Sequence, residues 1–321
     1  MKRPNRLRLP LIGMLAAFLL VAATALANEA PFDQQTITFW SDGARLRGDV
    51  FKPRDLDPGK KLPGIILFHG WGGNRSNLNR AYDPHFARRG FVVMTFDFRS
   101  WGDSDGFFVA DDALPAVDET SEIKLEGQHV RSIVNPLKMI DDARAALAWF
   151  VAEPGLQADK IGVWGTSLGG GLALVTAAKD RRVKALVTQV GAVNNKAAFD
   201  GIPEEMVVGW ETQRARGEIA PYPGPESASP ALEGYPDLIA MKKYDPAASW
   251  EALQVPTLII DAADEELFDR KINGMALHES LSGRAPTRYL VLPGKHYDIY
   301  RGEGYAGALE AAQDWFVEHL K

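Results

Sequence analysis

The chain has 321 residues, a formal net charge of −6, 46% hydrophobic residues and no cysteine. A chain of this length and composition can bury a large α/β core. The lack of cysteine excludes disulfides, cysteine-ligated zinc and a cysteine nucleophile. The chain is acidic and carries no basic stripe, so we expect no nucleic-acid partner.

The N-terminus resembles a secretory signal peptide at 1–27. A basic start precedes an apolar run over 11–23, and Ala25-Leu26-Ala27 follows as an A-x-A cleavage motif. We expect cleavage after Ala27, which leaves a domain over 28–321 in the periplasm or the medium. The apolar run is short for a bilayer span, and an uncleaved anchor is the alternative. No other apolar run approaches ~20 residues, so we expect no membrane contact after cleavage.

Strands and helices are expected to alternate after this segment. An opening hairpin is expected over 35–40 and 46–52, joined by the turn Ser41-Asp42-Gly43. Further strands are expected at 64–68, 91–96, 160–164, 183–190, 256–260 and 288–292, and helices at 77–89, 136–152, 170–178, 269–281 and 305–320. This alternation predicts an α/β fold with a mostly parallel central sheet and an antiparallel hairpin at one edge.

Two long segments interrupt the alternation, an insertion at 107–135 and a second one at 191–250. The second contains seven prolines and several aromatic residues. Loops of this length are commonly functional lids or disordered, and the aromatic residues argue against disorder. We therefore expect 191–250 to form a cap, and both segments to supply the walls of a pocket.

The segment Gly165–Gly169 reads G-x-S-x-G between the expected strand at 160–164 and the expected helix at 170–178. The bare pattern occurs by chance, but this context is typical of a nucleophile elbow, a tight turn that exposes a reactive serine. Glycines two positions before and after Ser167 remove Cβ atoms that would clash in such a turn. Ser167 is therefore the candidate nucleophile.

An activated serine needs backbone donors for the negative charge that develops on the attacked oxygen. The segment His69-Gly70-Trp71-Gly72-Gly73 directly follows a buried strand, and its glycines let the backbone approach a ligand. The N–H groups of Trp71 and of Leu168, the residue after the serine, are the candidate oxyanion-hole donors.

The serine also needs a base, and the base needs an acid that orients it. His296 is the candidate base, because among six histidines it alone follows the last strand in a glycine-containing loop. Four carboxylates crowd the loop Asp261–Glu266 after the preceding strand. Glu265 is favoured as the acid, and Asp264 is the alternative. The candidates come in the chain order serine, acid, histidine.

With this order of residues the chain resembles the α/β-hydrolase superfamily, most closely its bacterial dienelactone-hydrolase-like and X-prolyl-dipeptidyl-peptidase-like members. The segment Asp97–Gly106 is similar to the family's D-x-R-G-x-G-x-S-x-G loop, with Ser100 in place of the first glycine. In the family this loop shapes the fold and the pocket floor. The resemblance covers about 35–321.

The resemblance implies a serine hydrolase that cleaves a carboxylic ester or related acyl bond through an acyl-enzyme, and the N-terminal segment adds the expectation that it is exported. The expected partner is a small-molecule ester, and no organic cofactor or metal is required. An X-prolyl-type peptidase or amidase with the same catalytic groups is the alternative. A non-catalytic binding protein with the same fold is an alternative from a different functional class.

Overall fold

A computed structural model describes residues 32–54, 59–116, 122–230 and 232–321. The expected signal peptide lies outside these residues. The described chain forms an eight-stranded sheet in the order β1-β2-β4-β3-β8-β9-β11-β12. Its strands are β1 (Phe32–Ser41), β2 (Ala44–Pro53), β3 (Leu62–Phe68), β4 (Val92–Phe96), β8 (Leu156–Thr166), β9 (Val183–Gln189), β11 (Thr257–Ala262) and β12 (Thr287–Leu292).

The sheet is parallel from β4 to β12, while β2 pairs antiparallel with both β4 and β1. The β1–β2 hairpin closes through Asp42 and Gly43, whose φ angles of 47° and 76° are both positive. Two such residues are what a two-residue hairpin turn requires. The expected α/β fold with a mostly parallel sheet and an antiparallel N-terminal hairpin is confirmed.

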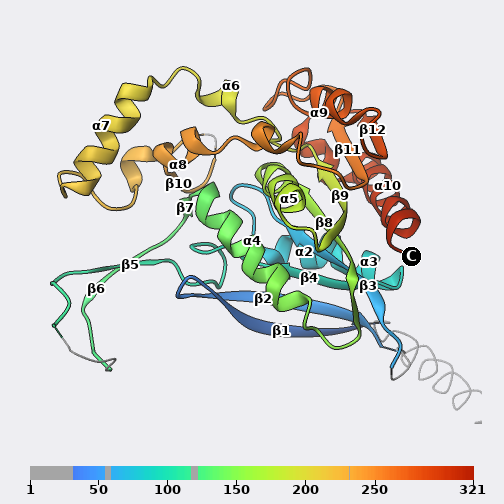
Figure 1. Cartoon of the computed structure of the whole chain (residues 1–321), viewed down its shortest axis with the longest axis horizontal. Helices are drawn as coiled ribbons and strands as arrows, with labels where there is room; N and C mark the ends of the chain where they lie inside the picture. The colour runs from blue at the N-terminus through green and yellow to red at the C-terminus, as the bar shows by residue number, and fades with distance from the viewer. Residues whose placement is uncertain (1–31, 55–58, 117–121, 231) are drawn as a thin grey trace, which may run out of the picture.

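Helices cover both faces of the sheet (Figure 1). One face packs on α4 (Pro136–Phe150), α5 (Leu168–Lys179) and α9 (Gly274–Leu281). The other face packs on α2 (Arg75–Ala81), α3 (Asp83–Arg88) and α10 (Gly302–Leu320). The central strands are buried on both sides, which explains the unbroken apolar runs such as Ile65–Phe68. No helix in the described ranges is long and apolar enough to cross a membrane.

The helices differ from expectation in two places. The single helix expected at 77–89 is two helices that break at Tyr82, because Pro84 near the start of α3 has no N–H to continue the first one. The helix expected from 269 begins only at Gly274. The residues before it form turns in which the backbone N–H of Asn273 donates to Asp269 O at 3.1 Å.

The two interrupting segments have different structures. Residues 107–135 contain a two-stranded arm, β5 (Phe107–Ala110) and β6 (Gly127–Val130), which projects from the body in Figure 1. Residues 191–250 contain α6 (Lys196–Phe199), α7 (Glu204–Ala215), α8 (Leu238–Lys243) and the short 3₁₀ helices Pro225–Ser227 and Pro246–Ser249. The segments join where β7 (Ile133–Val134) pairs with β10 (Tyr235–Pro236).

Candidate active site

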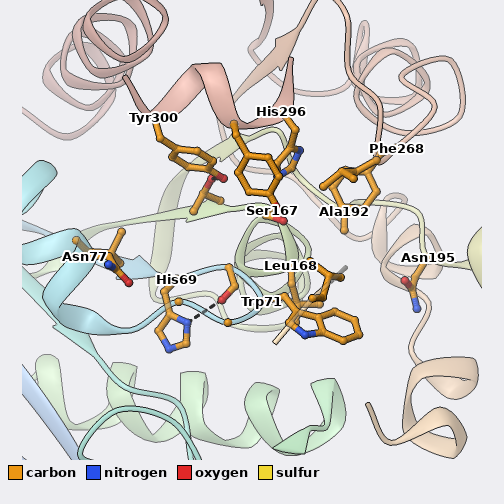
Figure 2. A pocket seen from close by; sticks show the side chains of 18 of the residues that line it. His69, Trp71, Asn77, Ser167, Leu168, Ala192, Asn195, Phe268, His296 and Tyr300 are labelled. Carbon is orange, nitrogen blue, oxygen red and sulfur yellow. Dashed lines mark hydrogen bonds between the residues drawn. The ribbon is translucent and has the colours of Figure 1, made fainter. Parts of the chain in front are cut away.

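Loops that follow parallel strands meet at one cavity of about 740 Å³. Ligands of open α/β sheets bind at this edge, beyond the carboxyl ends of the strands. The lining includes Trp71 after β3, Ser167 after β8, and His296 after β12. The segment after β9 adds Ala192 and Asn195. Figure 2 shows these side chains around the cavity.

Ser167 occupies a strained turn between β8 and α5. Its φ of 54° and ψ of −125° lie in a region that L-residues rarely adopt. A Cβ on Gly165 would lie 2.1 Å from the carbonyl oxygen of Gly169, and a Cβ on Gly169 would lie 2.4 Å from that of Phe68. The backbone N–H of Ser167 donates to Gln189 O at 3.0 Å, which holds the turn against the next strand. Both glycines are therefore sterically required, as the motif predicts.

The loop after β3 is oriented by His69. The Phe98 N–H donates to His69 Nε2 at 3.3 Å, so His69 Nδ1 carries the proton and donates to Gly70 O at 2.9 Å. Burial lowers the pKa of His69, which keeps the ring neutral. The Gly70–Trp71 peptide is trans, so the Trp71 N–H points away from the fixed carbonyl. His69 thus has a structural role in the glycine-rich loop.

Trp71 and Leu168 line the cavity together with the serine. A Cβ on Gly70 would lie 3.0 Å from Ser167 Cβ, so the loop backbone contacts the elbow directly. Leu168 is the first residue of α5, and its N–H has no acceptor within the helix. The positive end of the helix dipole also lies here, which favours negative charge.

The side chain of His296 contacts Glu265. Its Nδ1 lies 2.9 Å from both carboxylate oxygens of Glu265, and both side chains are only 2% exposed. The Leu267 N–H donates to Glu265 Oε1 at 3.0 Å, and the His296 N–H donates to Glu266 Oε2 at 2.9 Å. These contacts fix the loop after β11 against the loop after β12.

Asp264, the alternative acid, does not contact His296. It is exposed, and its own backbone N–H donates to Gly294 O at 2.9 Å. The side chain of Glu265 is buried against His296, and that of its neighbour Asp264 is exposed to solvent. The structure therefore brings together the histidine and the acid that the sequence favoured.

Asp261 is a further buried carboxyl near Glu265. It is 4% exposed and accepts a hydrogen bond from the Tyr289 hydroxyl at 2.9 Å. Burial raises the pKa of Asp261 to about 6, and the charge of Glu265 adds to this effect. The acidic loop thus contains carboxyl groups in very different environments.

Ser167 and His296 line the same cavity but are not hydrogen-bonded to each other. Within the described ranges, Ser167 Oγ and His296 Nε2 have no protein partner. Catalytic hydrogen bonds are often long in structures without substrate and tighten when it binds. The arrangement leaves the imidazole with one nitrogen held by a carboxylate and the other free.

A hydrogen-bonded group behind the serine was not identified from the sequence. The Thr166 hydroxyl donates to Gln189 O at 3.1 Å, so the Tyr300 hydroxyl donates to Thr166 Oγ1 at 2.7 Å. Burial raises the pKa of Tyr300 far above its usual value, which keeps it a donor. Tyr300 is the last residue of the 3₁₀ helix that begins at His296. Its position four residues after the candidate base is the sequence feature that could have identified it.

Two expectations about the pocket walls were wrong. None of the described residues of 107–135 lines the cavity, and the arm projects from the body of the protein in Figure 1. The loop Asp97–Gly106 does not form the floor either. It braces the fold, since Asp97 accepts from the Asp103 N–H at 2.9 Å and a Cβ on Gly102 would collide with that carboxylate.

Ser100 replaces the family glycine in this loop and has a φ of 75°. It therefore keeps the left-handed backbone that favours glycine. Its hydroxyl accepts from the Ile133 N–H at 2.9 Å, a contact that glycine would lack. Elsewhere in the described ranges, no group of three or more His, Cys, Asp or Glu side chains could hold a metal ion.

Known proteins are similar to this chain in sequence and in structure. The model of the prolyl oligopeptidase family matches residues 135–321, and that of the X-Pro dipeptidyl-peptidase (S15) family matches residues 42–201. The quorum-quenching protein AidA of Acinetobacter baumannii is 27% identical over 309 residues, which cover 86% of this chain and 91% of AidA.

Two solved structures show the same fold. That of the hypothetical protein PA2218 from Pseudomonas aeruginosa has a TM-score of 0.67 at 21% identity and covers 91% of this chain and 95% of PA2218. An acylaminoacyl peptidase from Pyrococcus horikoshii has a TM-score of 0.64 at 14% identity. The aligned region covers 94% of this chain but only 44% of the peptidase.

The fold and these similarities define a hydrolase of the α/β-hydrolase superfamily, of the serine-hydrolase type. More specifically, the match over residues 135–321 shows that the chain belongs to the prolyl oligopeptidase family.

Proposed function

We propose that this protein cleaves a carboxylic ester through an acyl-enzyme on Ser167. The observation that carries the proposal is the contact of His296 Nδ1 with both oxygens of Glu265, in the cavity that Ser167 lines. A histidine held by a buried carboxylate keeps its other nitrogen available as a base. Ser167, His296 and Glu265 are then nucleophile, base and orienting acid.

The reaction has two acyl transfers. Ser167 Oγ attacks the ester carbonyl carbon while His296 Nε2 takes the hydroxyl proton, and Glu265 stabilises the resulting imidazolium. Collapse of the tetrahedral intermediate breaks the bond to the alcohol oxygen, which leaves with the proton from His296. Water then attacks the acyl-enzyme with His296 as base, and the carboxylic acid is released with Ser167 restored.

The N–H groups of Trp71 and Leu168 are the proposed oxyanion donors. Each such donor is worth about 3 kcal/mol of transition-state stabilisation. The His69–Gly70 hydrogen bond supports this role, because it fixes the peptide that carries the Trp71 N–H before substrate binds. Preorganised donors of this kind cost no rearrangement during the reaction.

The same catalytic groups can cleave an ester or an amide, and the ester is the easier bond to cleave because its alcohol leaves more readily than an amine. Both matching family models are nevertheless named for peptidases, so a peptidase with the same catalytic groups is the second candidate.

Kinetics on matched chromogenic substrates test the proposal. We expect p-nitrophenyl esters to be hydrolysed with a far higher kcat/KM than Xaa-Pro p-nitroanilides. Ser167→Ala should lose at least about ten-thousandfold in kcat, because removal of the nucleophile alone removes most of the catalysis. An unchanged melting temperature would show that the variant is folded.

Each other outcome has a distinct meaning. Preference for the anilides, lost in Ser167→Ala, would favour the peptidase. Ester turnover that persists in Ser167→Ala would contradict the mechanism. A folded protein that hydrolyses no member of the panel would favour a non-catalytic binding protein.

We also propose that the protein is exported after cleavage behind Ala27. The basic start, the short apolar run and the A-x-A motif support this proposal. Expression of the full chain in a Gram-negative host, followed by cell fractionation and N-terminal sequencing, tests it. A periplasmic product that begins at Asn28 is expected, and a membrane-bound product that retains Met1 would contradict it.

A further inference from the structure

Asn195 presents an unusual polar group to the cavity. It lies at the start of α6 in the segment after β9, and it is 7% exposed. Its Nδ2 donates to Met241 O at 2.9 Å and to Tyr244 O at 3.2 Å. Both carbonyls belong to the C-terminal end of α8, where the last carbonyl groups of a helix have no following turn to supply N–H donors. Met241 O also accepts from the Tyr244 N–H at 3.3 Å.

These two bonds fix which way the amide faces. A flipped side chain would place Oδ1 against two carbonyl oxygens, which are acceptors only. The nitrogen must therefore face α8, and the oxygen faces away from it. In Figure 2, Asn195 lies beyond Trp71 and Leu168 on the side of the view away from His69.

The Asn195 oxygen has no partner among the described residues. An asparagine that begins a helix normally accepts a hydrogen bond from a backbone N–H of the first turn. Asn195 begins α6 but makes no such bond. The other residues of 191–250 that line the cavity are apolar, namely Ala192, Ala198, Phe199, Leu232 and Met241. A ligand that fills this part of the cavity would bury the Asn195 oxygen. Burial without a hydrogen bond costs free energy, so a ligand that places a donor here binds more favourably.

We infer that Asn195 is a specificity-determining residue that accepts a hydrogen bond from an N–H or O–H group of the substrate. This inference rests on the proposed ester hydrolysis at Ser167 and narrows its substrate class. The substrate is an apolar ester that carries a hydrogen-bond donor, such as an amide N–H, away from the scissile bond. A site built to bond a donor rejects the analogue that lacks it, because the site's own polar group is then left unpaired.

Two pairs of esters that differ by one group test the inference. The acyl-side pair is p-nitrophenyl N-acetylglycinate and p-nitrophenyl levulinate, in which a methylene replaces the N–H. The alcohol-side pair is the acetate ester of N-acetylethanolamine and its carbon analogue with the same replacement. Each ratio of kcat/KM is divided by the ratio of the rates with hydroxide, which removes differences in intrinsic reactivity.

The wild-type protein should prefer the N–H member of at least one pair by about tenfold, the value of one hydrogen bond. Asn195→Leu should reduce this preference to about one while it still hydrolyses the methylene analogue. Asn194→Leu is the matched control, because the neighbouring Asn194 bonds Ile272 O at 2.8 Å and does not line the cavity. This control should keep the preference.

Equal rates for both members of both pairs in the wild-type protein would overturn the assignment, and this result requires no variant to fold. A preference retained in folded Asn195→Leu would overturn it as well. If either result occurs and Ser167→Ala still loses hydrolysis of all four esters, the role of Asn195 is wrong but the proposed function of Ser167 stands. No hydrolysis of any member, or hydrolysis that persists in Ser167→Ala, would contradict the proposed function itself.

Discussion

The elbow Gly165–Gly169 and the acidic loop Asp261–Glu266 both lie at the carboxyl ends of parallel strands of one sheet, but different forces determine their structures. The elbow is fixed by local sterics, since each flanking glycine lies where a Cβ would meet a carbonyl oxygen. The acidic loop is fixed by tertiary contacts that bury Glu265 against His296 and leave Asp264 exposed. A motif therefore predicts the first region, whereas composition alone cannot rank the carboxylates of the second.

The largest expected effect separates two adjacent carboxylates in the acidic loop. Glu265→Gln should reduce kcat by about a thousandfold to ten-thousandfold, because the amide can no longer stabilise the imidazolium or hold the required tautomer. Asp264→Asn is the matched control and should change kcat by less than about twofold. Steady-state kinetics on a p-nitrophenyl ester measure both. A larger loss for Asp264→Asn than for Glu265→Gln would reverse our assignment.

A smaller effect is expected on stability at the elbow. Gly169→Ala places a Cβ 2.4 Å from Phe68 O and 2.5 Å from His69 O, and backbone atoms cannot move aside easily. We expect a loss of about 3 kcal/mol or more in the free energy of unfolding, measured with denaturant. Gly209→Ala in α7 has nothing within 4 Å of its Cβ and should stabilise by about 0.5–1 kcal/mol. Equal effects of the two changes would show that local sterics do not fix the elbow.

The smallest effect concerns the pH dependence of stability in the acidic loop. Asp261 has a folded-state pKa of about 6, above its ordinary value of 3.8, so the folded protein binds its proton more tightly than the unfolded chain. The ionised carboxylate of Asp261 therefore destabilises the folded state. This destabilisation is absent below pH 4 and complete above pH 6. Asp261→Asn should therefore stabilise the protein by about 2 to 3 kcal/mol at pH 7.5 and hardly at all at pH 4.

Denaturant unfolding of Asp261→Asn and the wild-type protein at several pH values gives this difference directly. Tyr289 can still donate to the amide oxygen of the variant, so the hydrogen bond that Asp261 accepts is retained. A difference in stability that does not change between pH 4 and pH 7.5 would contradict the proposed titration.

The sequence predicted the sheet and the elbow because both depend on short-range patterns, and it predicted the role of His296 from its place in a loop after the last strand. Buried apolar runs such as Ile65–Phe68 define strands, and the G-x-S-x-G spacing defines the turn at Ser167. The sequence did not predict the break at Tyr82 or the outward course of 107–135, which depend on a proline and on long-range packing. It also could not show Asn195, because the carbonyls that orient its amide lie 46 and 49 residues away in the chain.

The central claim is that Ser167 forms a covalent bond to the substrate's acyl group, and labelling with a fluorophosphonate tests it most directly. The reagent reacts with an activated serine, and peptide mapping by mass spectrometry locates the adduct. We expect a single adduct on the peptide that contains Ser167, formed in parallel with loss of ester hydrolysis and absent from folded Ser167→Ala. Full inactivation with the adduct on another residue, or hydrolysis that continues after Ser167 is fully modified, would contradict the claim.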